Sequence, residues 1–88
     1  KCLQYLQELS SVYLRTRYAS IKGDSCSTAV HAEETLKLME QCREECPPGY
    51  LEGNGYSKRI ERNVKLLLTA GKRRCLGYTA VEKEAPTE

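Results

Sequence analysis

The chain has 88 residues, of which 40% are hydrophobic and 30% are charged. This length accommodates one hydrophobic core, and the composition is that of a folded domain rather than a disordered segment. The net charge of +2 is too small to steer the whole molecule onto nucleic acid, and the longest aliphatic run, Leu66–Leu68, is too short to insert into a membrane. We expect a single domain over residues 1–78 and a flexible polar tail over residues 79–88.

Residues 2–21 repeat apolar side chains at steps of three and four, which is the period of an amphipathic helix. The positions on this stripe are Cys2, Tyr5, Leu6, Leu9, Val12, Tyr13, Thr16 and Ala19. Gly23 suits the C-terminal cap of the helix, because glycine adopts the left-handed conformation without strain. Asp24, Ser25 or Ser27 is expected to cap the next helix.

Residues 27–46 predict a second helix. Its apolar line is Ala29, Ala32, Leu36, Met39 and Cys46, with Leu38 and Cys42 at the flank. Ala29 and Ala32 are small enough to let another helix approach closely. Pro47 and Pro48 end this helix, because proline disfavours helical geometry in the residue before it. Residues 47–55 then form a loop rich in proline and glycine.

Residues 57–75 predict a third helix, which begins near Asn54 or Ser57. Its apolar face consists of Ile60, Val64, Leu67, Leu68, Gly71 and Cys75. The pattern as a whole predicts an all-α fold, a small bundle of three main helices.

Five cysteines are many for a chain of this size in a reducing compartment. A core this small provides only about 3–5 kcal/mol, so we expect two disulfides and a secreted or extracellular location. Consecutive antiparallel helices place Cys75 near Cys26, which predicts a bond between them. Cys2 is expected to bond with Cys46 or, alternatively, with Cys42. One of the latter two is left over, and an exposed Cys42 could bond to its counterpart in a second chain, giving a homodimer.

Charge is unevenly distributed along the chain. Residues 57–75 carry seven basic residues and one acidic residue, a net of +6, whereas residues 24–52 carry seven acidic and two basic residues, a net of −5. In one interpretation the acidic and basic helices face each other. In the other, a basic face binds an acidic partner, which is a receptor or other protein, or a sulfated glycan. The candidate partner-binding residues are Lys58, Arg59, Arg62, Lys65, Tyr50 and Tyr56.

Other partners and chemistries are poorly indicated. The basic residues come without a groove-reading motif or an aromatic platform, so we expect no nucleic-acid partner. His31 is the only histidine, and no motif places an Asn or Asp to orient it, so we expect no enzyme and no cofactor. Cys26, Cys42 and Cys46 could join His31 at a zinc ion in a cytosolic domain, but their spacing is not that of a paired zinc knuckle.

The positions of Cys2, Cys42 and Cys75 resemble those in secretoglobins. That resemblance implies a disulfide-linked helical dimer around an apolar cavity. Such a carrier of small apolar ligands would need a cavity lined by residues such as Leu9, Leu36, Met39 and Leu67. The chain departs from the family in having Cys26 and Cys46, in lacking Phe, and in its Pro-Gly loop.

These observations favour a small secreted, non-enzymatic binding protein, such as a ligand, a toxin-like effector or a receptor ectodomain. It would engage another protein through the basic third helix and the adjacent tyrosine- and glycine-containing loop. The alternatives are the dimeric carrier of apolar ligands and a cytosolic zinc-binding or scaffold domain.

Overall fold

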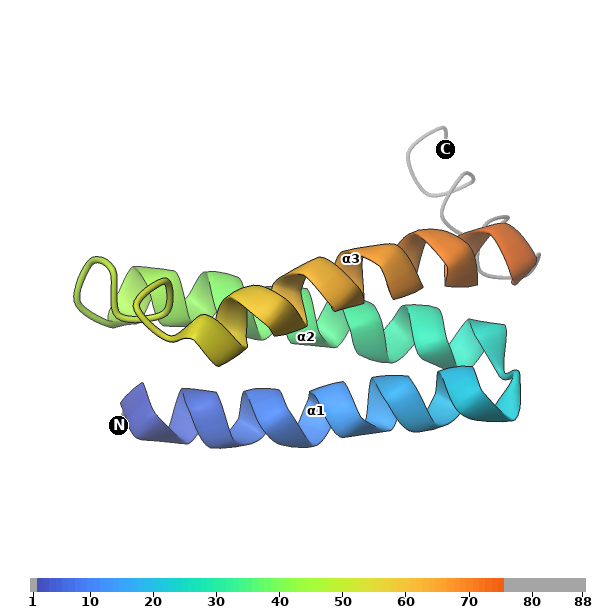
Figure 1. Ribbon diagram of the computed structural model, residues 1–88, viewed down its shortest axis with the longest axis horizontal. Coiled ribbons are helices and arrows are strands. Elements are labelled where there is room, and N and C mark those ends of the chain that lie inside the picture. Colours follow the sequence, from blue (N-terminus) through green and yellow to red (C-terminus); the bar gives the residue numbers. More distant parts are fainter. Residues whose placement is uncertain (1, 76–88) are drawn as a thin grey trace, which may run out of the picture.

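The computed structural model describes residues 2–75, which form three α-helices joined by two connections. Helix α1 spans Cys2–Lys22, α2 spans Ser25–Glu45 and α3 spans Gly55–Arg74. Both α1 and α3 pack along α2, and they contact each other much less (Figure 1). The fold is therefore the disulfide-stapled all-α bundle that the sequence predicts.

The helix ends follow from their capping residues. Gly23 has a φ of 82°, which reverses the chain after α1. Asp24 caps α2, because its side chain accepts a hydrogen bond from the backbone N–H of Ser27 at 3.1 Å. Asn54 caps α3 in the same way, accepting from the backbone N–H of Tyr56 at 2.9 Å. In both cases the earliest of the expected caps is used, so each helix begins two residues before its expected start.

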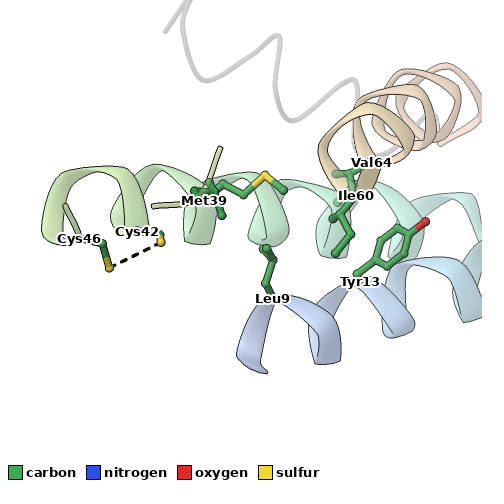
Figure 2. Packing of buried hydrophobic residues seen from close by; sticks show 9 residues of the cluster. Leu9, Tyr13, Met39, Cys42, Cys46, Ile60 and Val64 are labelled. Carbon is green, nitrogen blue, oxygen red and sulfur yellow. Dashed lines mark hydrogen bonds between the residues drawn. The ribbon is translucent and has the colours of Figure 1, made fainter. Parts of the chain in front are cut away.

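The core lies where the inward faces of the three helices meet (Figure 2). Its centre contains Leu9 and Tyr13 from α1, Met39 from α2, and Ile60 and Val64 from α3, all buried. Burying one side chain of this size stabilises the fold by about 1.5–3 kcal/mol. These positions belong to the stripes that the three- and four-residue periodicity predicts, so one periodic pattern accounts for both the helices and their packing.

Three buried threonines also belong to the inward faces. The hydroxyl groups of Thr16, Thr28 and Thr35 each donate a hydrogen bond to the carbonyl oxygen four residues earlier, at 2.8–2.9 Å. Their polar atoms are thus satisfied inside the core. The buried residues of α2 are Thr28, Ala29, Ala32, Thr35, Met39 and Cys42, and Cys46 just after the helix is buried too. The expected position of Cys42 at the flank is therefore wrong, since its exposed fraction is 1%.

Two expectations concern segments and membranes. The expected tail over residues 79–88, and the last residues of the expected 1–78 domain, lie outside the described residues. Among the helices formed by residues 2–75, none has the length and apolar character needed to cross a membrane.

Candidate binding surface

Two disulfides join helix ends at opposite ends of the bundle. Cys2, at the start of α1, is bonded to Cys46, just after α2, with a Cα–Cα distance of 6.0 Å. Cys26, near the start of α2, is bonded to Cys75, just after α3, with a Cα–Cα distance of 4.9 Å. These are the pairs that helix order predicts, and Cys42 is left as a free cysteine. Each outer helix is therefore covalently tied to α2.

Arg43 and Glu61 form an ion pair between α2 and α3, and each carries the sign of charge that is less common in its own helix. Nη2 of Arg43 on the acidic α2 donates to Oε1 of Glu61 on the basic α3 at 2.9 Å. Nε of Arg43 donates to Oε2 of Glu52 in the connecting loop at 2.6 Å. The bond to Glu52 is the largest of the causes that raise the pKa of Arg43, and the same bond lowers the pKa of Glu52. Arg43 thus holds both the loop and α3 against α2.

Most of the positive charge of α3 faces solvent. Lys58, Arg59 and Arg62 are exposed, and they form no ion pair with another residue of the described segment. Lys65 lies 3.5 Å from Glu61, but its side chain remains 64% exposed. The expectation that the acidic and basic helices face each other holds at the Arg43–Glu61 pair, but there α2 contributes the basic side chain and α3 the acidic one. Lys58, Arg59 and Arg62 take no part in this contact.

We call five exposed basic residues of α3 the cationic face; they are Lys58, Arg59, Arg62, Lys65 and Arg73, and Arg74 is exposed as well. Arg62 follows Lys58 by four residues and Arg59 by three, and Lys65 follows Arg62 by three, so these side chains lie on one side of the helix. Part of the face is hollowed, where Lys58, Arg62 and Lys65 line a shallow pocket of about 340 Å³ together with Glu61. Like charges one turn apart destabilise a helix by about 0.2–0.5 kcal/mol per pair. The isolated fold therefore carries a small electrostatic cost here that bound anionic groups would relieve.

The two candidate tyrosines lie in different environments. Tyr56, in the first turn of α3, is 49% exposed and lies on the same helix as the cationic face. Tyr50 is half-buried and packs against the core cluster. The structure thus presents Tyr56 to solvent, whereas Tyr50 helps to close the loop end of the bundle.

A second exposed feature, which the sequence pattern does not indicate, lies between α1 and α3. Tyr13, Arg17, Asn63, Leu66 and Leu67 line a pocket of about 320 Å³ there. Nδ2 of Asn63 donates to the hydroxyl oxygen of Tyr13 at 3.0 Å, and the Arg17 guanidinium lies 6.0 Å from the centre of the Tyr13 ring. The one charged residue lining this pocket is basic, so the pocket extends the positive surface of the bundle.

Exposed apolar side chains lie on the helices that form this pocket. They include Leu14, Tyr18 and Ile21 on α1 and Leu66 on α3. On α1 they recur at three- and four-residue steps, but on the side away from the inward stripe. A search for a second apolar stripe in residues 2–21 would have found them.

The first alternative function, a zinc-binding domain, requires several ligand side chains to lie close together. Within residues 2–75, no group of three or more His, Cys, Asp or Glu side chains is arranged to hold a metal ion. Two of the proposed zinc ligands, Cys26 and Cys46, are in disulfides, and Nδ1 of His31 lies 3.1 Å from Oε1 of Glu34.

The expected apolar cavity would need core residues that line an open space. Leu9 and Met39 belong to the core cluster, and Leu36 packs against it, whereas Leu67 lines the pocket between α1 and α3. A pocket of about 470 Å³ between α1 and α2 opens to solvent and is lined by Glu8, Ser11, Val12, Arg15, Glu34, Lys37, Leu38 and Gln41. Four of these side chains are charged and the pocket is open, so it is not the enclosed apolar cavity that a carrier of apolar ligands requires.

Comparisons with known proteins give no family: no family model matches the chain, and no curated protein or solved structure matches it. The resemblance to secretoglobins therefore rests on cysteine positions alone, and one of those cysteines, Cys42, is buried and unpaired.

Proposed function

We propose that the chain is a secreted, non-enzymatic protein that binds an acidic surface of another protein, such as a cell-surface receptor. The contact surface is the cationic face of α3 together with Tyr56. The observation that supports this most strongly is the pairing of Arg43 with Glu61. It satisfies the electrostatic contact between α2 and α3 without using Arg62 or Lys58, so these cations remain available to a partner.

The side chains of the surface suit protein recognition. Arginine and tyrosine are enriched among residues that dominate binding energy, and clustered charge of one sign accelerates association with an oppositely charged partner. The Cys26–Cys75 bond holds the end of α3 on α2. A helix that is already fixed loses less conformational freedom on binding.

The two disulfides also support the location. Disulfides persist in oxidising compartments and are rare in the cytosol, so a chain with two of them fits a role outside the cell.

A sulfated glycan would also match a row of cations. Exposed apolar groups beside the cations favour a protein instead, because a sulfated chain has little apolar surface to place on them. These groups are Tyr56, 49% exposed, and Leu66, 66% exposed.

The test is binding of the labelled chain to intact cells of its source organism. Arg62→Glu combined with Lys65→Glu should weaken binding by about tenfold or more, which corresponds to about 1.4 kcal/mol. The matched control is Arg15→Glu with Lys37→Glu, which changes the net charge equally at two exposed residues of α1 and α2 and should bind normally. Circular dichroism should show that both variants remain folded.

Two results would contradict the proposal. One is equal binding by the two double variants. The other is binding that disappears when sulfated glycans are removed enzymatically but survives protease treatment of the cells, which would assign the surface to a glycan.

A further inference from the structure

A free thiol touches one of the two disulfides. Cys42 and Cys46 point toward each other (Figure 2), with their Sγ atoms 3.7 Å apart. Cys46 is itself bonded to Cys2. Disulfides exchange when a thiolate attacks one of their sulfur atoms. A thiol in contact with one sulfur atom of a disulfide therefore provides all the reactants for such an exchange.

We propose that Cys42 is an internal nucleophile that opens the Cys2–Cys46 disulfide. The Cys42 thiolate attacks Sγ of Cys46, a Cys42–Cys46 bond forms, and the Cys2–Cys46 bond breaks. The electron pair of the broken bond leaves on the sulfur of Cys2, which takes up from solvent a proton equivalent to the one that Cys42 lost. One thiol and one disulfide are present before and after, so no oxidant or reductant is consumed.

The local backbone allows this movement. A disulfide bond of about 2.0 Å would bring the two sulfur atoms, now 3.7 Å apart, closer by about 1.7 Å. Cys46 is the C-terminal cap of α2, with φ of −106° and ψ of 163°, so it lies outside the regular helix. Its N–H still bonds to the carbonyl oxygen of Cys42 at 2.9 Å, which keeps the two residues together.

The surroundings of Cys42 limit the exchange. Burial raises the pKa of its thiol, and the charge of Glu52 in the loop raises it further, whereas Arg43 on α2 lowers it. Tyr5 of α1 is the further titratable group that interacts with Cys42. The reactive thiolate is therefore scarce at neutral pH, and the exchange should accelerate as pH rises.

The exchange would convert Cys2 into a thiol-modification site. Cys2 is the first residue of α1 and is only half-buried, whereas Cys42 is buried. Once released, the Cys2 thiol can exchange with a small disulfide such as oxidised glutathione, forming a mixed disulfide and releasing one reduced glutathione. Covalent attachment of another molecule would thus occur at Cys2 rather than at Cys42.

The test follows the folded protein in native buffer from slightly acidic to mildly alkaline pH. Samples are quenched with acid, free thiols are alkylated, and the links are mapped by mass spectrometry without reduction. A species with alkylated Cys2 and a Cys42–Cys46 bond should appear, at a rate that rises about tenfold per pH unit below the thiol pKa. The rate should not depend on protein concentration, and Cys26–Cys75 should stay intact as an internal control.

Cys42→Ala is the matched variant, because it keeps the buried site apolar. It should abolish release of Cys2, and oxidised glutathione should then give no adduct at Cys2. Release of Cys2 at an unchanged rate in Cys42→Ala would overturn the proposal. So would a wild-type protein in which Cys42 is alkylated at every pH while Cys2 and Cys46 stay bonded, or one that forms Cys2–Cys42 and frees Cys46.

Discussion

Gly71 of α3 lies so close to Ala29 of α2 that a Cβ atom at position 71 would lie 3.2 Å from the Cβ of Ala29. The same atom would lie 3.0 Å from the carbonyl oxygen of Ser25. This contact is next to the Cys26–Cys75 bond in sequence, so small residues and a disulfide together bring the end of α3 onto the start of α2.

Replacing this glycine should therefore destabilise the bundle. In Gly71→Ala the steric overlap alone should lower the free energy of unfolding by about 1–3 kcal/mol, because backbone atoms cannot rotate away from the added methyl group. This loss opposes a gain of about 1 kcal/mol in helix propensity. Urea unfolding measures the difference. Gly55→Ala is the control, since no atom lies within 4 Å of its added Cβ, and it should be no less stable than wild type. A gain of about 1 kcal/mol in Gly71→Ala, as helix propensity alone would give, would contradict this close packing.

The Cys26–Cys75 bond spans 49 residues of sequence. Its removal by the double change Cys26→Ala and Cys75→Ala should lower the free energy of unfolding by about 4 kcal/mol, because the unfolded chain regains the freedom that the loop had lost. The measurement is urea denaturation of the oxidised proteins. An unchanged midpoint would show that the bond does not constrain the chain as described.

Tyr5 should titrate apart from the other tyrosines. Its hydroxyl group donates a hydrogen bond to Glu45 at 2.5 Å, and this bond is the largest cause raising the Tyr5 pKa from 10.0 to about 12. Because the fold favours the neutral phenol, this contribution to stability is present below pH 10 and is lost as pH rises toward about 12. Ultraviolet titration should show a late-ionising tyrosine that disappears in Tyr5→Phe and ionises earlier in Glu45→Gln. Identical tyrosine titration curves for Glu45→Gln and wild type would refute the assignment.

Acid should weaken the link between the loop and α2. The hydrogen bond from Arg43 is the largest cause lowering the pKa of Glu52, so this contribution to stability is present above the ordinary glutamate pKa and is lost as pH falls through the lowered value. Glu52→Gln should therefore reduce the drop in stability on acidification, measured by thermal unfolding over a range of acidic pH. Glu40→Gln, at an exposed residue of α2, is the control. Identical acid profiles for Glu52→Gln and wild type would contradict the role of this pair.

Helix order was sufficient to predict much of the architecture. The apolar stripes of residues 2–21 and 57–75 correspond to the inward faces of α1 and α3. Antiparallel neighbours bring particular helix ends together, which predicts Cys26–Cys75 and brings Cys2 near both Cys46 and Cys42; in the structure Cys2 is bonded to Cys46.

The environment of Cys42 was not predicted, for a physical reason. When the inward face of α2 is defined by its apolar residues alone, Cys42 falls at the flank of that face. Thr28 and Thr35 are also buried, because their hydroxyl groups bond to their own helix. Including them rotates the inward face of α2 onto Cys42, and its contact with Cys46 becomes evident.

The distribution of ion pairs was beyond sequence reasoning as well. Net charges of −5 and +6 indicate attraction between the second and third helices, but they do not identify which side chains meet. Side-chain direction around each helix decides that Arg43 meets Glu61. The majority charges of α3 are thereby left on the outer face, where the candidate binding surface lies.

The intact mass of the purified native protein, measured before and after reduction, tests the whole proposal most directly. Two disulfides predict a gain of about four daltons on reduction, because each adds two hydrogen atoms. Alkylation of the unfolded but unreduced chain should label one thiol, that of the single free cysteine. An unchanged mass with all five cysteines labelled would contradict the stapled fold. It would also remove the basis for the extracellular location and for a fixed cationic face on α3.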